Sequence, residues 1–590
     1  MKNGNRMKKN VLSVIAALAL SATGVCGAVS FTACGDKSAN EVGTGKYSDL
    51  STTKIATADG VLESINSDRV FYVSNTPAQD ADGSKEKPYD IGNLLGASED
   101  KTILKPGDTV LMVPGTYRIS MTIEIHASGA FNSYLKIMNA AYVSGSGYES
   151  VADKEVILDF SDQSFASTAR GVQIYGDYIY WHGIDVCGAG DNGLYIGGSY
   201  NTIEYSEFYN NRDSGLQLGR SYSDTTDPKY NLIDNWPSYN LIKNCTSHNN
   251  YDNETYGENA DGFAAKLTVG YGNVFDGCIA YRNSDDGWDL YAKTDSGNIG
   301  TVIMYNCVAY ENGYLEYTQR ECNKKFPTWT GRLSEAGNAE GENKYGLDSY
   351  LTRDGDGNGF KLGGSVMEGD VLMYNCLSFN NRMHGVTDNS NPGVISVNYT
   401  TSFDNSAAID NDPTSATFGQ IIAAENHESH GNINMARQSY SYNNLSHVLS
   451  AWDNMVVSLE ADEYRASVTD SILCNAAGSK KANKIQGSID ANTNKDINGS
   501  VIGPVSTQEI NALNAADIFE TLPILKTGAE YTYNISGLKD LYSAGSVTAL
   551  NANRAHYKYR NPDCSINMGT ILDIKDGAQS KLLGSSNPIG

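Results

Sequence analysis

A repeated pattern between residues 187 and 405 constrains the fold of this chain more than any other feature. A small residue or cysteine is followed three positions later by an aromatic residue or histidine, and five positions later by asparagine. Seven matches in one phase indicate a repeated structural unit. The instances are Cys187/Asn192, where glycine replaces the aromatic residue, and Ser206/Tyr209/Asn211, Cys245/His248/Asn250, Cys278/Tyr281/Asn283, Cys307/Tyr310/Asn312, Cys376/Phe379/Asn381 and Thr400/Phe403/Asn405.

The spacing of aligned glycines sets the length of the unit at about two dozen residues, as between Gly171, Gly193 and Gly215. Short β-forming runs with turn-forming Asn and Gly in each unit favour an all-β fold, a right-handed parallel β-helix whose coils stack about 4.8 Å apart. In such a fold the asparagines form a hydrogen-bonded ladder at a turn. The cysteines form an inward stack and serve as small core residues, because no C-x-x-C pair or compact zinc spacing occurs.

The chain divides into five predicted segments. Residues 1–33 are typical of a lipoprotein-type signal peptide, in which Phe31-Thr-Ala-Cys34 resembles a lipobox and Cys34 is the lipidated residue; simple secretion is the alternative. Residues 34–67 form a polar linker. Residues 68–160 form a β-rich opening segment with a short helix around 91–98, followed by the β-helix catalytic domain at 161–480. Residues 481–590 supply the last coils and a cap that includes a helix at 508–519.

The formal net charge of −25 and pI near 4.7 argue against nucleic acid or an anionic membrane surface as partners. An anionic substrate would need a bound cation between it and the protein. We expect an exported bacterial protein that is secreted or held at the cell surface and is monomeric. Its only attachment to a membrane would be the N-terminal lipid.

The repeat also gathers acidic residues at equivalent positions. Relative to the aligned glycines at 262, 287 and 359, Asp261 and Asp286 lie one step before, Asp285 two steps before, and Asp289 and Lys361 two steps after. Asp-Gly alone is an ordinary turn signal. Stacked on adjacent coils, however, Asp261 and Asp286 would lie about 5 Å apart and repel. A Ca²⁺ ion, which takes oxygens at about 2.3–2.6 Å, would fit between them.

Lys361 occupies the same position of the repeat as Asp289, one coil later. Its amine could therefore reach the edge of the same site. A nearby divalent cation would lower its pKa and make it a general base. The alternative is a surface lysine paired with Asp289. The preceding Asp354-Gly-Asp356-Gly-Asn358 begins like an EF-hand loop but lacks the closing Glu. We interpret it as a glycine-rich turn that delivers Lys361, with a further calcium site as the alternative.

Two insertions enter the chain just before these strands. The glycine normally follows the ladder asparagine by four residues, but by twelve after Asn250 and by forty-seven after Asn312. Long loops on a rigid array are usually functional, so we expect them to wall a groove. The larger insertion carries basic and aromatic residues suited to an acidic sugar chain, namely Lys324, Lys325, Trp329 and Arg332. Candidate substrate-binding residues are Arg282, Arg353, Arg382, His384 and Lys293.

Over Val70 to Asn405 the chain resembles the family 9 polysaccharide lyases, calcium-dependent pectate lyases with a right-handed parallel β-helix. The resemblance rests on Asn-Ala-Asp261-Gly-Phe, Asn-Ser-Asp285-Asp286-Gly-Trp-Asp289 and Gly-Asn-Gly-Phe-Lys361-Leu-Gly-Gly. It implies that the four aspartates bind the catalytic calcium and that Lys361 is the Brønsted base. It also implies β-elimination on polygalacturonate, with 4,5-unsaturated oligogalacturonides as products. The insertion between 313 and 357 is less clearly a family feature.

Three other functions remain open at this point. A β-helical glycoside hydrolase could use two of the carboxylates as acid and base, giving saturated products without calcium. A lyase could act on another uronate polymer, such as alginate or a glycosaminoglycan. A non-catalytic polysaccharide-binding protein could use calcium only to bridge the sugar. The product formed and the metal dependence distinguish these functions.

Overall fold

The computed structural model describes residues 63–64, 69–222, 227–252, 254–325, 345–403, 405–406 and 408–422, and short strands between residues 433 and 533. The predicted signal peptide with Cys34, nearly all of the 34–67 linker, Trp329, Arg332 and the predicted 508–519 helix lie outside these residues.

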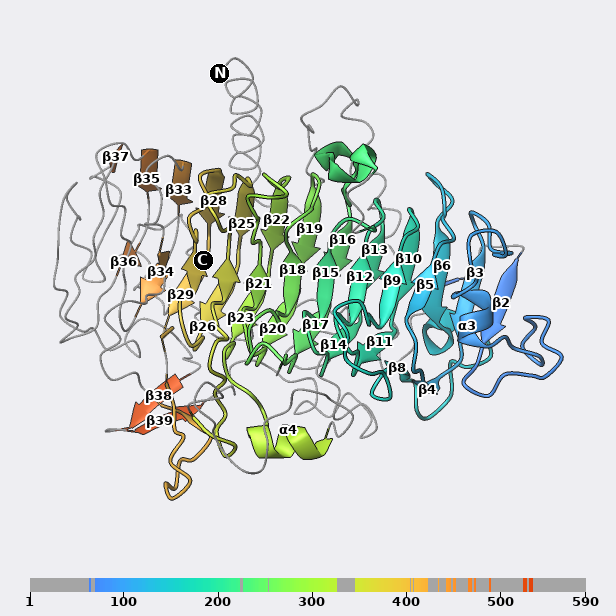
Figure 1. Ribbon diagram of the computed structural model, residues 1–590, viewed down its shortest axis with the longest axis horizontal. Coiled ribbons are helices and arrows are strands. Elements are labelled where there is room, and N and C mark those ends of the chain that lie inside the picture. Colours follow the sequence, from blue (N-terminus) through green and yellow to red (C-terminus); the bar gives the residue numbers. More distant parts are fainter. Residues whose placement is uncertain are drawn as a thin grey trace, which may run out of the picture.

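Three long parallel sheets form the body of the protein, and most coils add one strand to each of them (Figure 1). The first sheet contains β2 (Val70–Val73), β3 (Thr109–Met112), β6 (Leu135–Asn139), β10 (Ile179–His182), β13 (Thr202–Glu204), β16 (Leu241–Lys243), β19 (Asn273–Asp276), β22 (Val302–Tyr305), β25 (Val371–Tyr374), β28 (Val394–Asn398), β33 (Tyr442–Ser446), β35 (Arg465–Thr469) and β37 (Ser488–Ile489).

The second sheet contains β4 (Gly115–Arg118), β8 (Val156–Asp159), β11 (Asp185–Cys187), β14 (Glu207–Tyr209), β17 (Thr246–His248), β20 (Ile279–Tyr281), β23 (Val308–Tyr310), β26 (Leu377–Phe379), β29 (Thr401–Phe403), β34 (Leu449–Ala451) and β36 (Ile472–Leu473). The third sheet contains β5 (Ile123–Ile125), β9 (Val172–Ile174), β12 (Leu194–Ile196), β15 (Leu216–Leu218), β18 (Phe263–Ala265), β21 (Trp288–Asp289), β24 (Phe360–Lys361), β27 (Val386–Thr387) and β32 (Ile433–Asn434).

Smaller elements decorate this stack. The predicted helix near residue 91 is confirmed as α3 (Ile91–Leu94), capped by the Asp90 side chain, which accepts from the amides of Gly92 and Asn93. Helix α4 (Gln319–Lys325) belongs to the larger insertion and stands outside the stack (Figure 1). The remaining elements are the pair β1 (Glu63–Ser64) and β7 (Val143–Ser144), the pair β30 (Ala408–Ile409) and β31 (Ile421–Ile422), the pair β38 (Ile524–Thr527) and β39 (Glu530–Tyr533), and the 3-10 helices η1 (Ala140–Tyr142), η2 (Pro228–Asn231) and η3 (Ile233–Asn235).

The core fills the interior between the three sheets, and strand alternation decides which residues enter it. In the third sheet, Phe263, Trp288 and Phe360 are register partners and point inward. Their rings stack with centroids 5.0 and 4.7 Å apart. Burying each such ring contributes about 2–3 kcal/mol relative to leaving it in water. The residue after each ring therefore lies on the outer face of the sheet.

The predicted asparagine ladder is confirmed. From Asn211 to Asn405, each side-chain amide donates to the side-chain oxygen of the ladder asparagine on the next coil, and all of these asparagines are buried. The ladder supplies partners for buried amides that water cannot reach, which is why asparagine recurs at this turn. The N···O distances are 3.0, 2.8, 3.0, 2.9 and 2.8 Å for the successive pairs 211/250, 250/283, 283/312, 312/381 and 381/405.

The sequence interpretation placed the first instance of the repeat in the wrong phase. Cys187 pairs with Tyr209, so it lies in the aromatic column rather than in the cysteine stack. The ladder position of this coil is held by Ala189, whose backbone amide donates to Asn211 at 3.1 Å. Asn192 lies three residues after Ala189, just before Gly193. It fitted the pattern only because it happens to follow Cys187 by five residues. The other four cysteines of the pattern are free and lie in the core, as predicted: Cys245, Cys278, Cys307 and Cys376.

Within the part of the chain that the structure describes, no helix is long and apolar enough to cross a membrane.

Candidate active site

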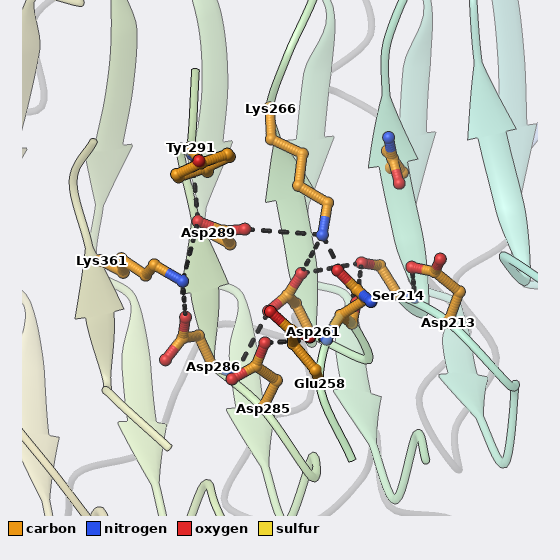
Figure 2. Close-up of polar contacts among 12 residues, drawn as sticks. Asp213, Ser214, Glu258, Asp261, Lys266, Asp285, Asp286, Asp289, Tyr291 and Lys361 are labelled. Atoms are coloured by element: carbon orange, nitrogen blue, oxygen red, sulfur yellow. Dashed lines mark hydrogen bonds and ion pairs between the residues drawn. The ribbon is translucent and has the colours of Figure 1, made fainter. Parts of the chain in front are cut away.

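The predicted acidic residues meet on the outer face of the third sheet, over β18, β21 and β24. Ala264, Asp289 and Lys361 are register partners on three successive coils. Asp261 and Asp286 lie just before the glycines that open β18 and β21, and Asp285 lies one residue earlier. Figure 2 shows these side chains gathered into one cluster, with Asp289 lying between two lysines. The phase of the repeat thus places these residues on one face, as expected, while their roles as metal ligands and base stay predictions.

Gly287 explains why a glycine follows Asp286. A Cβ at this position would lie 2.6 Å from the carbonyl oxygen of Gly359 and 2.8 Å from the ladder amide of Asn312, so a side chain cannot fit. Gly262 is confined in the same way by the next coil and by Asn283. Glycine is therefore required here for lack of space rather than for a left-handed backbone conformation. The close approach of the backbone to the ladder fixes the aspartates beside the outer face.

Asp261, Asp285 and Asp286 could hold a metal ion together. Each offers a carboxylate oxygen within 4.8 Å of the others, and all three are buried; among the described residues no other group of three carboxylate, His or Cys ligands meets this spacing. Asp286 Oδ2 is buried without a well-aligned hydrogen bond, although the Lys361 amine lies 2.9 Å away. The three carboxylates together form a buried, oxygen-rich setting suited to Ca²⁺.

Backbone and amide donors from the two insertions orient these carboxylates. Asp285 accepts from the amide of Asn259 at 2.9 Å and from that of Asp356 at 2.7 Å. Asp286 Oδ1 accepts from both the backbone and the side-chain nitrogen of Asn358, each at 2.7 Å. The insertions also contact one another, since the Asp354 amide donates to the Tyr256 carbonyl at 3.0 Å. Both insertions therefore donate hydrogen bonds to the site, while the groove they were expected to wall stays a prediction.

Lys361 lies at one edge of the cluster. Its amine is 2.9 Å from Asp286 Oδ2, 3.8 Å from Asp289 Oδ1 and 3.9 Å from Asp356 Oδ2. Burial favours the neutral amine, but the attraction of these carboxylates outweighs it and raises the pKa of Lys361 well above its usual value. Without a metal ion Lys361 is therefore an ammonium. It becomes a base only if the surrounding negative charge is compensated.

Lys266, on the opposite side of Asp289, was not predicted from the sequence. Its amine lies 2.6 Å from Asp261 Oδ2 and 3.5 Å from Asp289 Oδ2. Burial opposes its charge, yet Asp261 and Asp289 raise its pKa above the usual value. One signal was available in the sequence. Lys266 lies two residues after Ala264, so strand alternation puts it on the same outer face.

The charge of the cluster matches a divalent cation. Four buried aspartates, buried Lys266 and partly buried Lys361, if all are ionised, leave a net charge of −2. Half-exposed Asp356, 3.9 Å from the Lys361 amine, is a further negative charge at the edge of the cluster. Burial raises the pKa of Asp261 to about 8 and that of Asp286 well above its usual value, so it is unfavourable for the metal-free cluster to hold all of that charge. A Ca²⁺ ion would supply the two missing positive charges, and the residues present fit it.

The predicted substrate-binding residues do not form one set in the structure. Arg282 pairs with Glu311 at 2.5 Å, and Arg353 pairs with Asp354 at 2.7 Å. The Arg382 guanidinium donates to the carbonyl of Gly355 at 2.9 Å, and the backbone amide of buried His384 donates to Asn358, so both support the segment that precedes Lys361. Lys293 is exposed after β21, and Lys324 is exposed on α4. Their contacts with a substrate stay predictions.

The turn before Lys361 adopts the predicted glycine-rich form. Gly357 has a φ of 84°, a left-handed conformation that favours glycine, and a Cβ there would lie 2.6 Å from the backbone of Gly313. Asp354 is paired with Arg353, and the backbone of Asp356 donates to Asp285. The segment therefore delivers Asn358 and Lys361 to the cluster.

Fold and site together define a class, the parallel β-helix proteins that carry a buried carboxylate–lysine cluster on the outer face of one sheet. A family profile described as "Pel9A-like, right handed beta helix region" matches residues 71–325 and 338–432, more than half of the chain. The chain belongs to this family.

Similar proteins agree with this assignment. "Pectate lyase L" of Paenibacillus polymyxa is 38% identical over 324 residues, which are 55% of this chain and 62% of that protein. "Pectate lyase L" of Thermoclostridium stercorarium is 35% identical over 330 residues, 56% of this chain and 22% of that protein. This chain thus spans less than two thirds of either relative. The crystal structure of pectate lyase Pel9A shares the fold, with a TM-score of 0.52, 22% identity, and coverage of 91% of this chain and 95% of that one.

Proposed function

We propose that this protein is a polysaccharide lyase that cleaves polygalacturonate by β-elimination, with calcium held by Asp261, Asp285, Asp286 and Asp289 and with Lys361 as the base. The observation that carries the proposal is the position of the Lys361 amine, 2.9 Å from Asp286 at the edge of a buried cluster whose charge calls for a divalent cation. The relatives named pectate lyases support the choice of substrate.

The chemistry assigns a separate task to each group. Bound calcium would neutralise the uronate carboxylate and acidify the proton on C5. Asp286 and Asp289 hold the Lys361 amine beside the cluster, and the neutral amine takes the C5 proton. The electrons of the C5–H bond form the C4=C5 double bond as the C4–O bond breaks. The departing oxygen keeps the electron pair of the C4–O bond and takes up a proton from solvent. The segment from 352 to 358, supported by Arg382, keeps Lys361 in place.

Ultraviolet absorbance of the protein acting on polygalacturonate tests this proposal, with added calcium and then with a chelator. The conjugated C4=C5 product absorbs, so we expect an increase that the chelator stops. Chain shortening without absorbance would indicate a glycoside hydrolase. Absorbance only with alginate or a glycosaminoglycan would move the substrate to another uronate polymer. Calcium-dependent binding without cleavage would indicate a polysaccharide-binding protein.

We further propose export to the cell surface, from residues 1–34 alone. The apolar run between 11 and 20 and the lipobox-like sequence support a signal peptide and a lipid on Cys34. Mass spectrometry of the protein from a bacterial host tests this. A mature N-terminus at Cys34 carrying acyl chains is expected, and cleavage elsewhere without a lipid would indicate simple secretion.

A further inference from the structure

Lys266 is a buried lysine whose amine contacts two aspartates of the acidic cluster. Its side chain is only 8% exposed. The amine lies 2.6 Å from Asp261 Oδ2, 3.4 Å from the carbonyl oxygen of Asn259 and 3.5 Å from Asp289 Oδ2. An ammonium group has three N–H donors, and three protein oxygens surround this one. Asp261 Oδ2 and the Asn259 carbonyl accept hydrogen bonds from Lys266, and Asp289 forms an ion pair with it, so the amine is directed at the protein.

These contacts join two coils of the third sheet. Asp261 precedes β18, whereas Asp289 belongs to β21, and Lys266 reaches both from the end of β18. Ser214 from the preceding coil also donates to Asp261 Oδ2, at 2.9 Å. Because Lys266 and Ser214 occupy Oδ2, the other oxygen, Oδ1, faces the next coil and accepts from the Asp286 amide at 3.2 Å. Figure 2 shows Lys266 and Lys361 on opposite sides of Asp289.

The two lysines are therefore not equivalent. Lys361 faces Asp286 Oδ2, the oxygen that lacks a well-aligned donor, and lies next to half-exposed Asp356. Lys266 lies on the other side of Asp289, with its amine 2.6 Å from Asp261 Oδ2 and 3.5 Å from Asp289 Oδ2 (Figure 2). A fixed positive charge in this position offsets repulsion among the carboxylates and also repels an incoming cation.

We propose that Lys266 is a positioning residue, a built-in cation that assembles Asp261 and Asp289 before calcium binds and limits the affinity of the cluster for calcium. This inference rests on the calcium site of the proposed function. It assigns to Lys266 neither proton transfer nor substrate binding.

Calorimetric titration of the purified full chain with CaCl₂, together with thermal unfolding in chelator and in calcium, tests the inference. For Lys266→Met we expect a Tm in chelator about 5 °C below that of the unaltered protein, because a buried pair loses one partner. Calcium should restore that Tm. The calcium Kd should fall about tenfold, because one repelling charge has gone. Lys266→Arg keeps the charge and should stay within about threefold of the unaltered Kd.

Lys243→Met is the matched control. The Lys243 amine pairs at 3.6 Å with Glu204, whose side chain is 3% exposed, on the first sheet. Its loss also breaks a buried pair, so Tm should fall equally in chelator and in calcium, with the calcium Kd unchanged.

Three results would overturn the inference. They are an unchanged or weaker calcium affinity in Lys266→Met, a Tm loss that calcium does not restore, and a raised KM for polygalacturonate with an unaltered calcium Kd. The absorbance assay on the unaltered protein judges the proposed function separately. A protein that binds calcium but forms no unsaturated product would refute the lyase assignment, while the titrations would still decide the role of Lys266.

Discussion

Asp289 and Lys361 are register partners on adjacent coils, and the Lys361 amine lies 3.8 Å from Asp289 Oδ1 while it approaches Asp286 more closely, at 2.9 Å. Lys361 is thus held by two carboxylates of the preceding coil, those of Asp286 and Asp289. This arrangement couples the proposed base to the proposed metal site, because the charges that keep Lys361 protonated are those that a cation would neutralise.

Lys361→Ala tests the proposed base. We expect lyase activity to fall by about 10³-fold or more, because proton abstraction loses its acceptor. The calcium Kd should not rise, because the substitution removes a positive charge from the cluster. Absorbance assays and calorimetric titration measure these two effects. Lys361→Arg keeps the charge but not the basicity, and it should be equally inactive. Appreciable activity in either variant would show that another group takes the proton.

Asp286→Asn tests the metal site. Asp286 is fully buried and lies in the one group of three ligands found among the described residues. Replacing its charge by an amide should weaken calcium binding by about 100-fold or more, because calcium affinity depends on ligand charge. Activity should reappear in part at high calcium. Binding that matches the unaltered protein would place the metal elsewhere, for example at Asp354 and Asp356.

The fold was largely predictable from the sequence because each coil needs the same residue types at the same positions. Asn250, Asn283 and Asn312 recur in one phase since each must hydrogen-bond the next, and the glycines recur because the ladder passes close to them. The phase error at Cys187 has a physical cause. This coil has Ala189 at the ladder position, so it lacks the residue that defines the pattern.

The site was predictable where it follows the repeat and less so where it depends on side-chain reach. Asp261, Asp285, Asp286 and Asp289 follow from phase alone. Lys266 was missed because it lies four residues after Gly262, outside the positions next to the aligned glycines where the other residues were found. Asn259 and Asn358 contribute through hydrogen bonds that come from insertions of irregular length, and no periodicity predicts those. The basic residues proposed for substrate could not be placed, because the partners of Arg353 and Arg382 lie in the insertion of irregular length that precedes Lys361.

Gly287→Ala tests whether backbone packing positions Asp286. The added methyl group would meet Gly359 O at 2.6 Å and the Asn312 amide at 2.8 Å, so neighbouring coils must move apart. We expect a loss of about 1–3 kcal/mol in the free energy of unfolding, together with weaker calcium binding. Gly92→Ala in α3 is the control, since its Cβ would approach only the Asp90 side chain, at 3.1 Å. Normal stability and calcium affinity in Gly287→Ala would show that the coils adapt.

The pH dependence of calcium binding follows from the buried carboxylates. Burial raises the pKa of Asp261 to about 8, so this group binds a proton in the folded metal-free protein at pH values where the unfolded chain has lost it. The folded state then holds more protons, and its metal-free stability falls as pH rises from about 4 to about 8. Calcium must displace the proton, so its affinity should increase with pH up to about 8 and then level off.

Calorimetric titrations between pH 6 and pH 9, in buffers that differ in ionisation enthalpy, measure both the calcium Kd and the protons released. Asp261→Asn removes the titrating group, so its weaker binding should lose much of this pH dependence. Binding of calcium to the unaltered protein without proton release at pH 7 would show that Asp261 is already ionised. The two lysines would then outweigh burial, and Lys266 would compensate the cluster more fully than the contact distances suggest.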